Sequence, residues 1–125
     1  MRESPEMYLE TILVLKQKNT DGIHAIDVAK ALGYSKPSVS KAFSRLKESG
    51  LIEIDANDHI ILLPKGEQIA RAVYERHEVL TDILIRLGVP KETATKDACR
   101  IEHVISQETF DVLKEIHLRL NENAK

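Results

Sequence analysis

The chain has 125 residues, of which 42% are hydrophobic and 30% are charged, and its formal net charge is −2. This composition predicts a globular protein of one domain or two small ones and excludes a protein that is strongly basic throughout. No apolar run is long enough for a membrane span or a signal-peptide core, and a single cysteine excludes an internal disulfide, so we expect a cytoplasmic protein.

The first half of the chain carries three helix signals separated by clear breaks. Ser4-Pro5-Glu6 predicts the start of a first helix, which the segment 19–22 ends. Apolar residues at helical spacing predict a short helix from about Ile26 to Leu32, with Gly33 as its stop. A third helix is expected to begin at Ser35 and to end before Gly50.

Two β-branched runs, residues 51–55 and 59–63, follow these helices and are joined by the turn-prone residues 56–58. Helix, short helix, tight turn, helix and hairpin in this order are typical of a winged helix-turn-helix. The sequence therefore predicts a mainly α fold with a small β-hairpin wing, and a DNA-binding domain over residues 1–63.

The start of the third helix has the composition of a DNA-contacting segment. In a helix-turn-helix the N-terminal residues of the second helix meet base edges, while lysines and hydroxyl groups bind phosphates. No acidic residue lies between Lys36 and Lys47. The alternatives are a solvated basic face or a helix-turn-helix that contacts only protein. The predicted DNA-binding residues are Ser35, Lys36, Pro37, Ser38, Ser40 and Lys41.

The second half of the chain is predicted to be entirely helical, as one domain over residues 64–125. A connecting helix is expected at 64–87, a further helix from Pro90 to about Ile105, and a last one from Thr109 to Leu120. The apolar stripe of the last helix predicts a homodimer interface, and packing within one chain is the alternative. Its predicted interface residues are Phe110, Leu113 and Ile116.

The segment 99–103 contains the only cysteine of the chain close to an acid and a histidine. On a helix the positions i, i+3 and i+4 share one face, so Cys99, Glu102 and His103 would converge. Sulfur, oxygen and nitrogen donors at one point form a site for a divalent transition metal. The alternative is a buried cysteine beside a surface Glu-His pair.

Several motifs in order along the chain resemble the diphtheria toxin repressor family of metal-activated transcriptional repressors. These are Glu6-Met7-Tyr8-Leu9, the helix-turn-helix, Arg76-His77, and the block from Asp97 to Ser106. The resemblance implies an operator-binding homodimer that is not an enzyme, in the two-domain form without the C-terminal β-barrel. It also implies regulatory metal ligands at Met7, Cys99, Glu102 and His103, the ligand types of the iron-responsive branch.

The resemblance departs from the iron-responsive branch at a second, ancillary site. Two positions that hold an acid and a histidine there correspond to Thr81 and Thr95, which are poor ligands. Glu10 matches a ligand of the manganese-responsive branch, where it pairs with the histidine equivalent to His77. A second site formed by Glu10 and His77, sharing Glu102 or Cys99 with the first, is therefore expected as one of two alternatives, the other being two surface residues.

These expectations give one preferred function and two competitors. The preferred function is a repressor of metal-homeostasis genes activated by Fe²⁺ or, next, by Mn²⁺, with Co²⁺, Ni²⁺ or Zn²⁺ as substitutes in vitro. No membrane and no organic substrate are expected as partners. The competitors are a metal-independent winged-helix regulator that senses a small organic ligand, and a metalloenzyme that uses a glutamate as general base.

Overall fold

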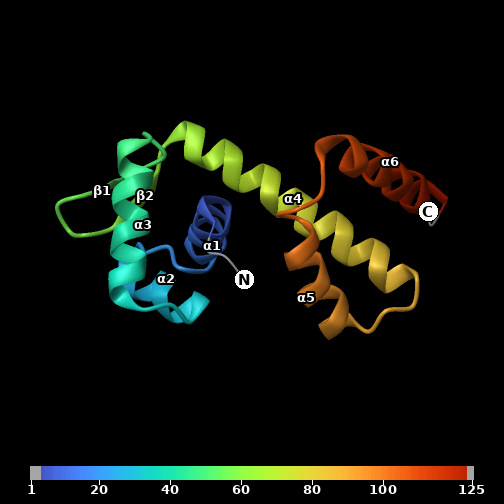
Figure 1. Cartoon of the computed structure of the whole chain (residues 1–125), viewed down its shortest axis with the longest axis horizontal. Coiled ribbons are helices and arrows are strands. Elements are labelled where there is room, and N and C mark those ends of the chain that lie inside the picture. Colours follow the sequence, from blue (N-terminus) through green and yellow to red (C-terminus); the bar gives the residue numbers. More distant parts are fainter. Residues whose placement is uncertain (1–3, 124–125) are drawn as a thin grey trace. The chain divides into compact units, whose positions relative to one another are not determined.

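The computed structural model describes residues 4–123 and is mainly α-helical with one antiparallel hairpin, which confirms the predicted fold class. The described elements are α1 (Pro5–Lys18), α2 (Ala25–Leu32), α3 (Lys36–Glu48), β1 (Ile52–Ile54), β2 (Ile60–Leu62), α4 (Pro64–Arg86), α5 (Lys91–Ile101) and α6 (Gln107–Asn123), labelled in Figure 1. They form two compact units, which divide within α4 between Arg71 and Ala72. Within residues 4–123, no helix is long and apolar enough to cross a membrane.

The first helix begins where its capping residues predict. The Ser4 side chain accepts a hydrogen bond from the Met7 amide at 3.2 Å, and Pro5 takes the first helical position, where no amide is needed. Asn19 ends the helix in an extended conformation. The buried side of α1 includes Met7, Tyr8 and Leu9, which are at most 8% exposed.

The helix-turn-helix of the first unit is formed by α2 and α3. Gly33 ends α2 at φ 71°, a left-handed conformation that glycine adopts without a Cβ clash. Two residues later the Ser35 side chain accepts a hydrogen bond from the Ser38 amide at 3.3 Å and so caps α3. Val39, Phe43 and Leu46 form the buried side of α3.

The wing is a short hairpin in which Ile52 pairs with Leu62 and Ile54 with Ile60. Both strands are shorter than the β-branched runs that predict them, because Asp55 accepts amide hydrogen bonds from Asn57 and His59 and so turns the chain. The Ile60 amide donates to the Ile23 carbonyl at 2.9 Å, which joins the hairpin to the segment before α2. The wing is therefore hydrogen-bonded to the helix-turn-helix.

The core of the first unit collects apolar side chains from α1, α2, α3 and the hairpin. Its largest fully buried members are Tyr8, Leu9, Ile12, Ile23, Val28, Val39 and Ile52. The first turn of α4 closes against this unit at Gly66, where an added Cβ would collide with the Leu51 carbonyl group. A glycine is required there by this close backbone approach.

In the second unit, α5 and α6 lie beside the second part of α4 (Figure 1). Val79 and Ile83 of α4 form an apolar cluster with Phe110 of α6, and Ile105 and Leu113 pack against it. Phe110 is only 2% exposed in the single chain, and its place in an interface between two chains stays a prediction. Its ring is already covered by α4.

The remaining apolar residues of α6 have different surroundings. Leu113 is half-buried in the same cluster as Phe110, whereas Ile116 is 43% exposed. The helix itself, Gln107–Asn123, extends beyond the predicted range of 109–120 at both ends. At its start, Ser106 caps it by accepting a hydrogen bond from the Thr109 amide. The exposed apolar side chains of α6 are Val112, Ile116, Leu118 and Leu120.

The predicted helix from Pro90 to about Ile105 is too long, since α5 ends at Ile101. Glu102 and His103 therefore lie in the turn after the helix. The start of α6 is one reason, because a helix cap at Ser106 needs extended backbone that a continuous helix cannot supply.

Asp82 of α4 contacts both Arg86 of the same helix and His117 of α6, and so links the two helices in the second unit. Arg86 Nε donates to Asp82 Oδ2 at 2.8 Å, and His117 Nε2 lies 2.8 Å from the same oxygen. The hydrogen bond from Arg86, with help from His117, lowers the pKa of Asp82 below its ordinary value. A carboxyl group with a lowered pKa in the folded state stabilises the fold above its unfolded pKa and loses this effect as pH falls.

We expect Asp82→Asn to reduce the free energy of unfolding at pH 7 by about 0.5–1 kcal/mol, a small value because the carboxylate is partly exposed. The difference from the parent protein should shrink below about pH 4, where the parent carboxylate becomes protonated. Urea unfolding at pH 7, 5 and 3 measures both effects. Glu115→Gln, which breaks the exposed pair with Arg119, is the control. A constant difference across this pH range would contradict the assignment.

Candidate functional site

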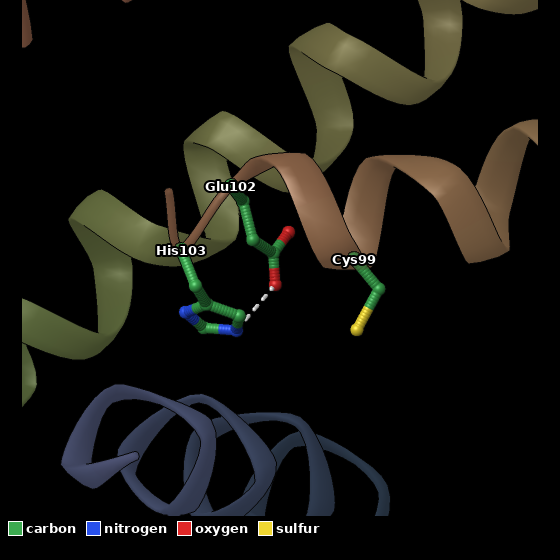
Figure 2. A group of neighbouring side chains, drawn as sticks. All are labelled: Cys99, Glu102 and His103. Atoms are coloured by element: carbon green, nitrogen blue, oxygen red, sulfur yellow. Dashed lines mark ion pairs between the residues drawn. The ribbon is translucent and has the colours of Figure 1, made fainter. Parts of the chain in front are cut away.

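Three candidate metal ligands converge at the end of α5. The sulfur of Cys99, a carboxylate oxygen of Glu102 and a ring nitrogen of His103 all lie within 4.8 Å of one another. Figure 2 shows the three side chains projecting to the same side of the chain, with the Glu102 carboxylate facing the His103 ring. The predicted convergence of these residues is therefore present in the structure.

The sequence predicts that the three residues share one face of a helix, but in the structure they do not all lie on the helix. Cys99 lies on the last turn of α5, Glu102 is its C-terminal cap, and His103 follows in the turn. Their convergence depends on this turn. The Glu102 amide still donates to the Ala98 carbonyl at 2.9 Å, so Glu102 keeps a helical position relative to Cys99, and only the chain beyond it leaves the helix.

A fourth candidate ligand, His77, comes from α4. Its Nδ1 lies 3.0 Å from Glu102 Oε2, while His103 Nε2 lies 3.2 Å from Glu102 Oε1. The carboxylate thus has an imidazole against each oxygen. Both histidines are largely covered, with side chains 24% and 12% exposed. The prediction named His77 as a ligand of a second site that shares Glu102 or Cys99, and the structure brings its ring against Glu102.

Glu102 is the buried charged residue of the described chain, with a relative exposure of 0%. Taking a carboxylate out of water is costly unless charges or hydrogen bonds compensate it. Among residues 4–123, no group donates a hydrogen bond to Glu102 Oε1, although His103 Nε2 faces it. A buried carboxylate oxygen that accepts no hydrogen bond can still coordinate a metal ion. Beside imidazole and thiol groups, it fits a site for a divalent transition metal.

Arg76 of α4 shapes the turn that presents Glu102 and His103. Its Nη1 donates to the carbonyl oxygens of Glu102 and Ile105, both at 3.2 Å, and its Nη2 donates to Gln107 Oε1 at 2.6 Å. The guanidinium also lies over the Phe110 ring, 5.4 Å from its centroid. These bonds satisfy carbonyl groups that the end of α5 leaves without helical partners.

Sequence reasoning did not assign this role to Arg76. The residue belongs to the motif Arg76-His77, but its partners lie 26 to 31 positions further along the chain. No local pattern connects residues at that separation. The signal available in the sequence is only that Arg76 directly precedes the candidate ligand His77.

Met7 and Glu10, the predicted ligands from the N-terminal segment, lie on α1 in the first unit. Met7 is 8% exposed, and its sulfur accepts a hydrogen bond from the Tyr34 hydroxyl at 3.9 Å. Glu10 is half-buried. Their role as metal ligands stays a prediction.

The two threonines that the resemblance matches to ancillary-ligand positions are Thr81 and Thr95. Thr95 donates its hydroxyl to the Lys91 carbonyl at 2.8 Å, within α5. Thr81 Oγ1 is buried and makes no hydrogen bond to the described residues. Hydroxyl oxygens are weak metal ligands beside carboxylates and imidazoles, and the expected departure from the ancillary site stays a prediction.

The predicted DNA-contacting residues lie together at the start of α3. Ser35, Lys36, Pro37, Ser40 and Lys41 are exposed, and Ser38 is half-buried because it takes part in the helix cap. A cavity of about 350 Å³ beside this helix is lined by Lys41, Arg45 and the Ser4-Pro5 start of α1, among others. Cations and hydroxyl groups at such a surface suit contact with phosphates, which keeps these residues as candidates.

Both halves of the chain match models of known protein domains. Residues 1–60 match the iron dependent repressor N-terminal DNA binding domain. Residues 63–123 match the iron dependent repressor metal binding and dimerisation domain. Together these matches cover both compact units.

Individual relatives agree with these matches. The chain is 36% identical over 113 residues to the transcriptional regulator MntR of Escherichia coli O6:H1, covering 90% of this chain and 72% of that protein. It is 36% identical over 107 residues to the iron-dependent repressor IdeR of Mycobacterium leprae, covering 85% of this chain and 46% of that one. The crystal structure of the metal-dependent transcriptional regulator MtsR superposes with a TM-score of 0.85 at 26% identity, covering 93% of this chain and 54% of that chain.

We expect Arg76→Ala to lower the free energy of unfolding by about 1–3 kcal/mol, because carbonyl groups in the turn lose their donor and Phe110 loses its cation contact. Arg76→Lys should recover only part of the loss, since an ammonium group cannot reproduce the forked donor geometry. Urea unfolding followed by circular dichroism measures both. Arg71→Ala is the control, because Arg71 makes an exposed pair with Glu67 and should cost less than about 0.5 kcal/mol. Equal losses for Arg71→Ala and Arg76→Ala would contradict this role.

Proposed function

The chain belongs to the iron-dependent repressor family of metal-dependent transcriptional regulators, and on this premise we propose that it represses genes of metal homeostasis by binding operator DNA as a metal-loaded homodimer. The observation that carries the proposal is the fully buried Glu102 carboxylate, with an imidazole against each oxygen and a cysteine sulfur beside it. The cytoplasm is the compartment that this function requires.

Cys99, Glu102 and His103 would hold the regulatory ion, together with Met7 from α1. When bound, a divalent ion supplies positive charge that compensates the buried carboxylate and links its ligands. Donors from both units would then be tied to one another, so α1 and the helix-turn-helix packed on it would be held in one arrangement. Ion binding affects DNA affinity only by its difference between the competent and incompetent arrangements.

Fe²⁺ is the proposed ion in the cell. A neutral thioether from Met7 and a sulfur from Cys99 suit Fe²⁺ better than Mn²⁺, which prefers oxygen ligands. The similarity to a protein named as an iron-dependent repressor supports the same choice. Co²⁺, Ni²⁺ and Zn²⁺ would substitute in vitro, because imidazole and sulfur donors bind these ions well.

Glu10 and His77 are proposed as ligands of a second ion. The contact of 3.0 Å between His77 Nδ1 and Glu102 Oε2 supports a place for His77 next to the first site. A carboxylate that accepts an imidazole on one oxygen is able to bridge two ions with its two oxygens. The number of ions bound per chain, one or two, then depends on whether Glu10 is a ligand.

The recognition helix is proposed to be α3, with Ser35, Lys36, Pro37, Ser38, Ser40 and Lys41 toward the DNA. Hydroxyl groups and lysines would bind phosphates, and the Pro37 ring would pack on a thymine methyl group. Two half-sites require two recognition helices at a fixed separation, which a symmetric dimer provides.

The exposed apolar side of α6, including Ile116, is proposed as part of the dimer interface. Ile116 and Val112 are 43% and 58% exposed, and Leu113 lies between this side and the chain's own core. We further propose that residues 1–63 form the DNA-binding domain and residues 64–125 the metal-binding and dimerisation domain, with the helix at 64–87 shared structurally by both.

The metal assignment is tested with a double variant, Met7→Asp with Cys99→Glu, which replaces two soft or borderline donors by carboxylates. We expect its activation by Mn²⁺ relative to Fe²⁺ to rise by roughly tenfold or more over the parent ratio. The measurement is anaerobic fluorescence anisotropy with a duplex that the metal-loaded protein has selected from a random pool. Glu102→Gln is the control that should lose activation by either ion.

Three outcomes would contradict different parts of the proposal. Equal responses of the parent to both ions, with no change in the double variant, would refute the iron assignment alone. Full metal activation of Glu102→Gln would refute the metal centre. Operator binding by the chelator-treated parent, unchanged when metal is added, would support the metal-independent regulator that senses an organic ligand.

The DNA assignment is tested with Lys41→Ala. If Lys41 neutralises a phosphate, the variant should bind every duplex more weakly, and the slope of log affinity against log salt should fall by about one unit. Affinity titrations at several salt concentrations measure the slope. Lys96→Ala, an exposed lysine of α5, removes the same charge elsewhere and is the control. An unchanged slope for Lys41→Ala would count against α3 as the recognition helix.

A further inference from the structure

Tyr34 contacts the Met7 side chain across 27 sequence positions within the first unit. Its hydroxyl donates a hydrogen bond to Met7 Sδ at 3.9 Å. A thioether sulfur is a weak acceptor, and it is also the only polar atom of the methionine side chain. The contact therefore concerns the one atom through which Met7 would bind a metal ion.

The backbone of Tyr34 is fixed by the turn of the helix-turn-helix. Its amide donates to the Ala29 carbonyl at 3.1 Å, directly after Gly33, whose left-handed conformation ends α2. The next residue, Ser35, caps α3. Tyr34 thus lies between the last bond of one helix and the first cap of the next, and its Cα cannot shift without disturbing one of them.

The ring of Tyr34 is positioned by a chain of aromatic contacts. The Tyr8 ring centroid lies 6.0 Å from that of Tyr34 and 6.1 Å from that of Phe43. Tyr8 is on α1 beside Met7, and Phe43 is on the buried side of α3. Because aromatic pairs at this separation restrict ring orientation, the Tyr34 hydroxyl has a defined place next to the methionine sulfur.

We propose that Tyr34 is a positioning residue for Met7, which holds the sulfur in place before the ion binds. This inference rests on the proposed function, in which Met7 is a ligand. The sulfur has two lone pairs, so one can accept the Tyr34 hydrogen while the other remains for the ion. A methionine side chain has three rotatable bonds, and fixing them in advance lowers the entropy that metal binding must otherwise lose.

The same contact links metal binding to the recognition helix. Met7 is held through Tyr34 to the turn that precedes α3, so an ion that fixes Met7 also restrains the start of α3. Any coupling of this kind is reciprocal, and DNA bound at α3 should raise metal affinity by the same factor. The contact gives this chain a direct route from a ligand to the helix-turn-helix within one compact unit.

The test compares Tyr34→Phe, which removes only the hydroxyl, with the matched control Tyr74→Phe on α4. Zn²⁺ is the probe, and its affinity for the full-length chain is measured by competition with a chromogenic chelator. We expect roughly three- to tenfold weaker Zn²⁺ binding for Tyr34→Phe and no change for Tyr74→Phe. The thermal unfolding midpoint of the metal-free variants should stay near that of the parent, which separates positioning from a loss of fold.

A second readout follows Met7 directly. The chain has 2 methionines, Met1 and Met7, so labelling methionine methyl groups with ¹³C gives one reporter and one internal reference. In the metal-free protein we expect Tyr34→Phe to shift or broaden the Met7 methyl signal and to leave that of Met1 in place. Added Zn²⁺ should move the Met7 signal of the parent.

The outcomes distinguish this inference from the proposal on which it rests. Zn²⁺ binding at the parent that leaves the Met7 methyl signal unmoved would overturn both Met7 as a ligand and Tyr34 as its positioning residue. A Met7 signal that responds to Zn²⁺, combined with equal or tighter Zn²⁺ binding by Tyr34→Phe, would overturn the role of Tyr34 alone.

Discussion

A fully buried carboxylate at Glu102 is the constraint around which the second unit is organised. Burying a charge requires compensating groups, and here they come from different elements: His77 on α4 and His103 in the turn after α5. One oxygen still accepts no hydrogen bond from residues 4–123. A site of this kind is easier to explain by a divalent ion than by structural need, because apolar residues would fill the same space at lower cost.

The turn that carries Glu102 is held by the Arg76 guanidinium, which is not itself one of the candidate metal ligands. Arg76 satisfies the carbonyl groups of Glu102 and Ile105, contacts Gln107 and covers the Phe110 ring. Its neighbour His77 touches the Glu102 carboxylate itself. Successive residues of α4 therefore hold the backbone and the side chain of the same candidate ligand, a supporting arrangement that metal sites in proteins depend on.

The first unit combines a rigid turn with a candidate ligand in an analogous way. Ser35 and Gly33 fix the connection between α2 and α3, and Tyr34 between them reaches the Met7 sulfur on α1. Regulation by a metal requires that the ion distinguish two arrangements of the DNA-binding surface. A candidate ligand attached to this turn by a hydrogen bond would provide a physical means of doing so.

Local signals in the sequence determined most of the secondary structure and indicated the candidate ligands. Ser4, Gly33 and Ser35 act through neighbouring backbone, so capping rules place α1, α2 and α3 correctly. The tertiary structure alone decided where α5 ends and which way Phe110 faces. Both depend on α4, through the Arg76 hydrogen bonds and the apolar cluster with Val79 and Ile83, contacts between residues distant in the sequence that no periodicity encodes.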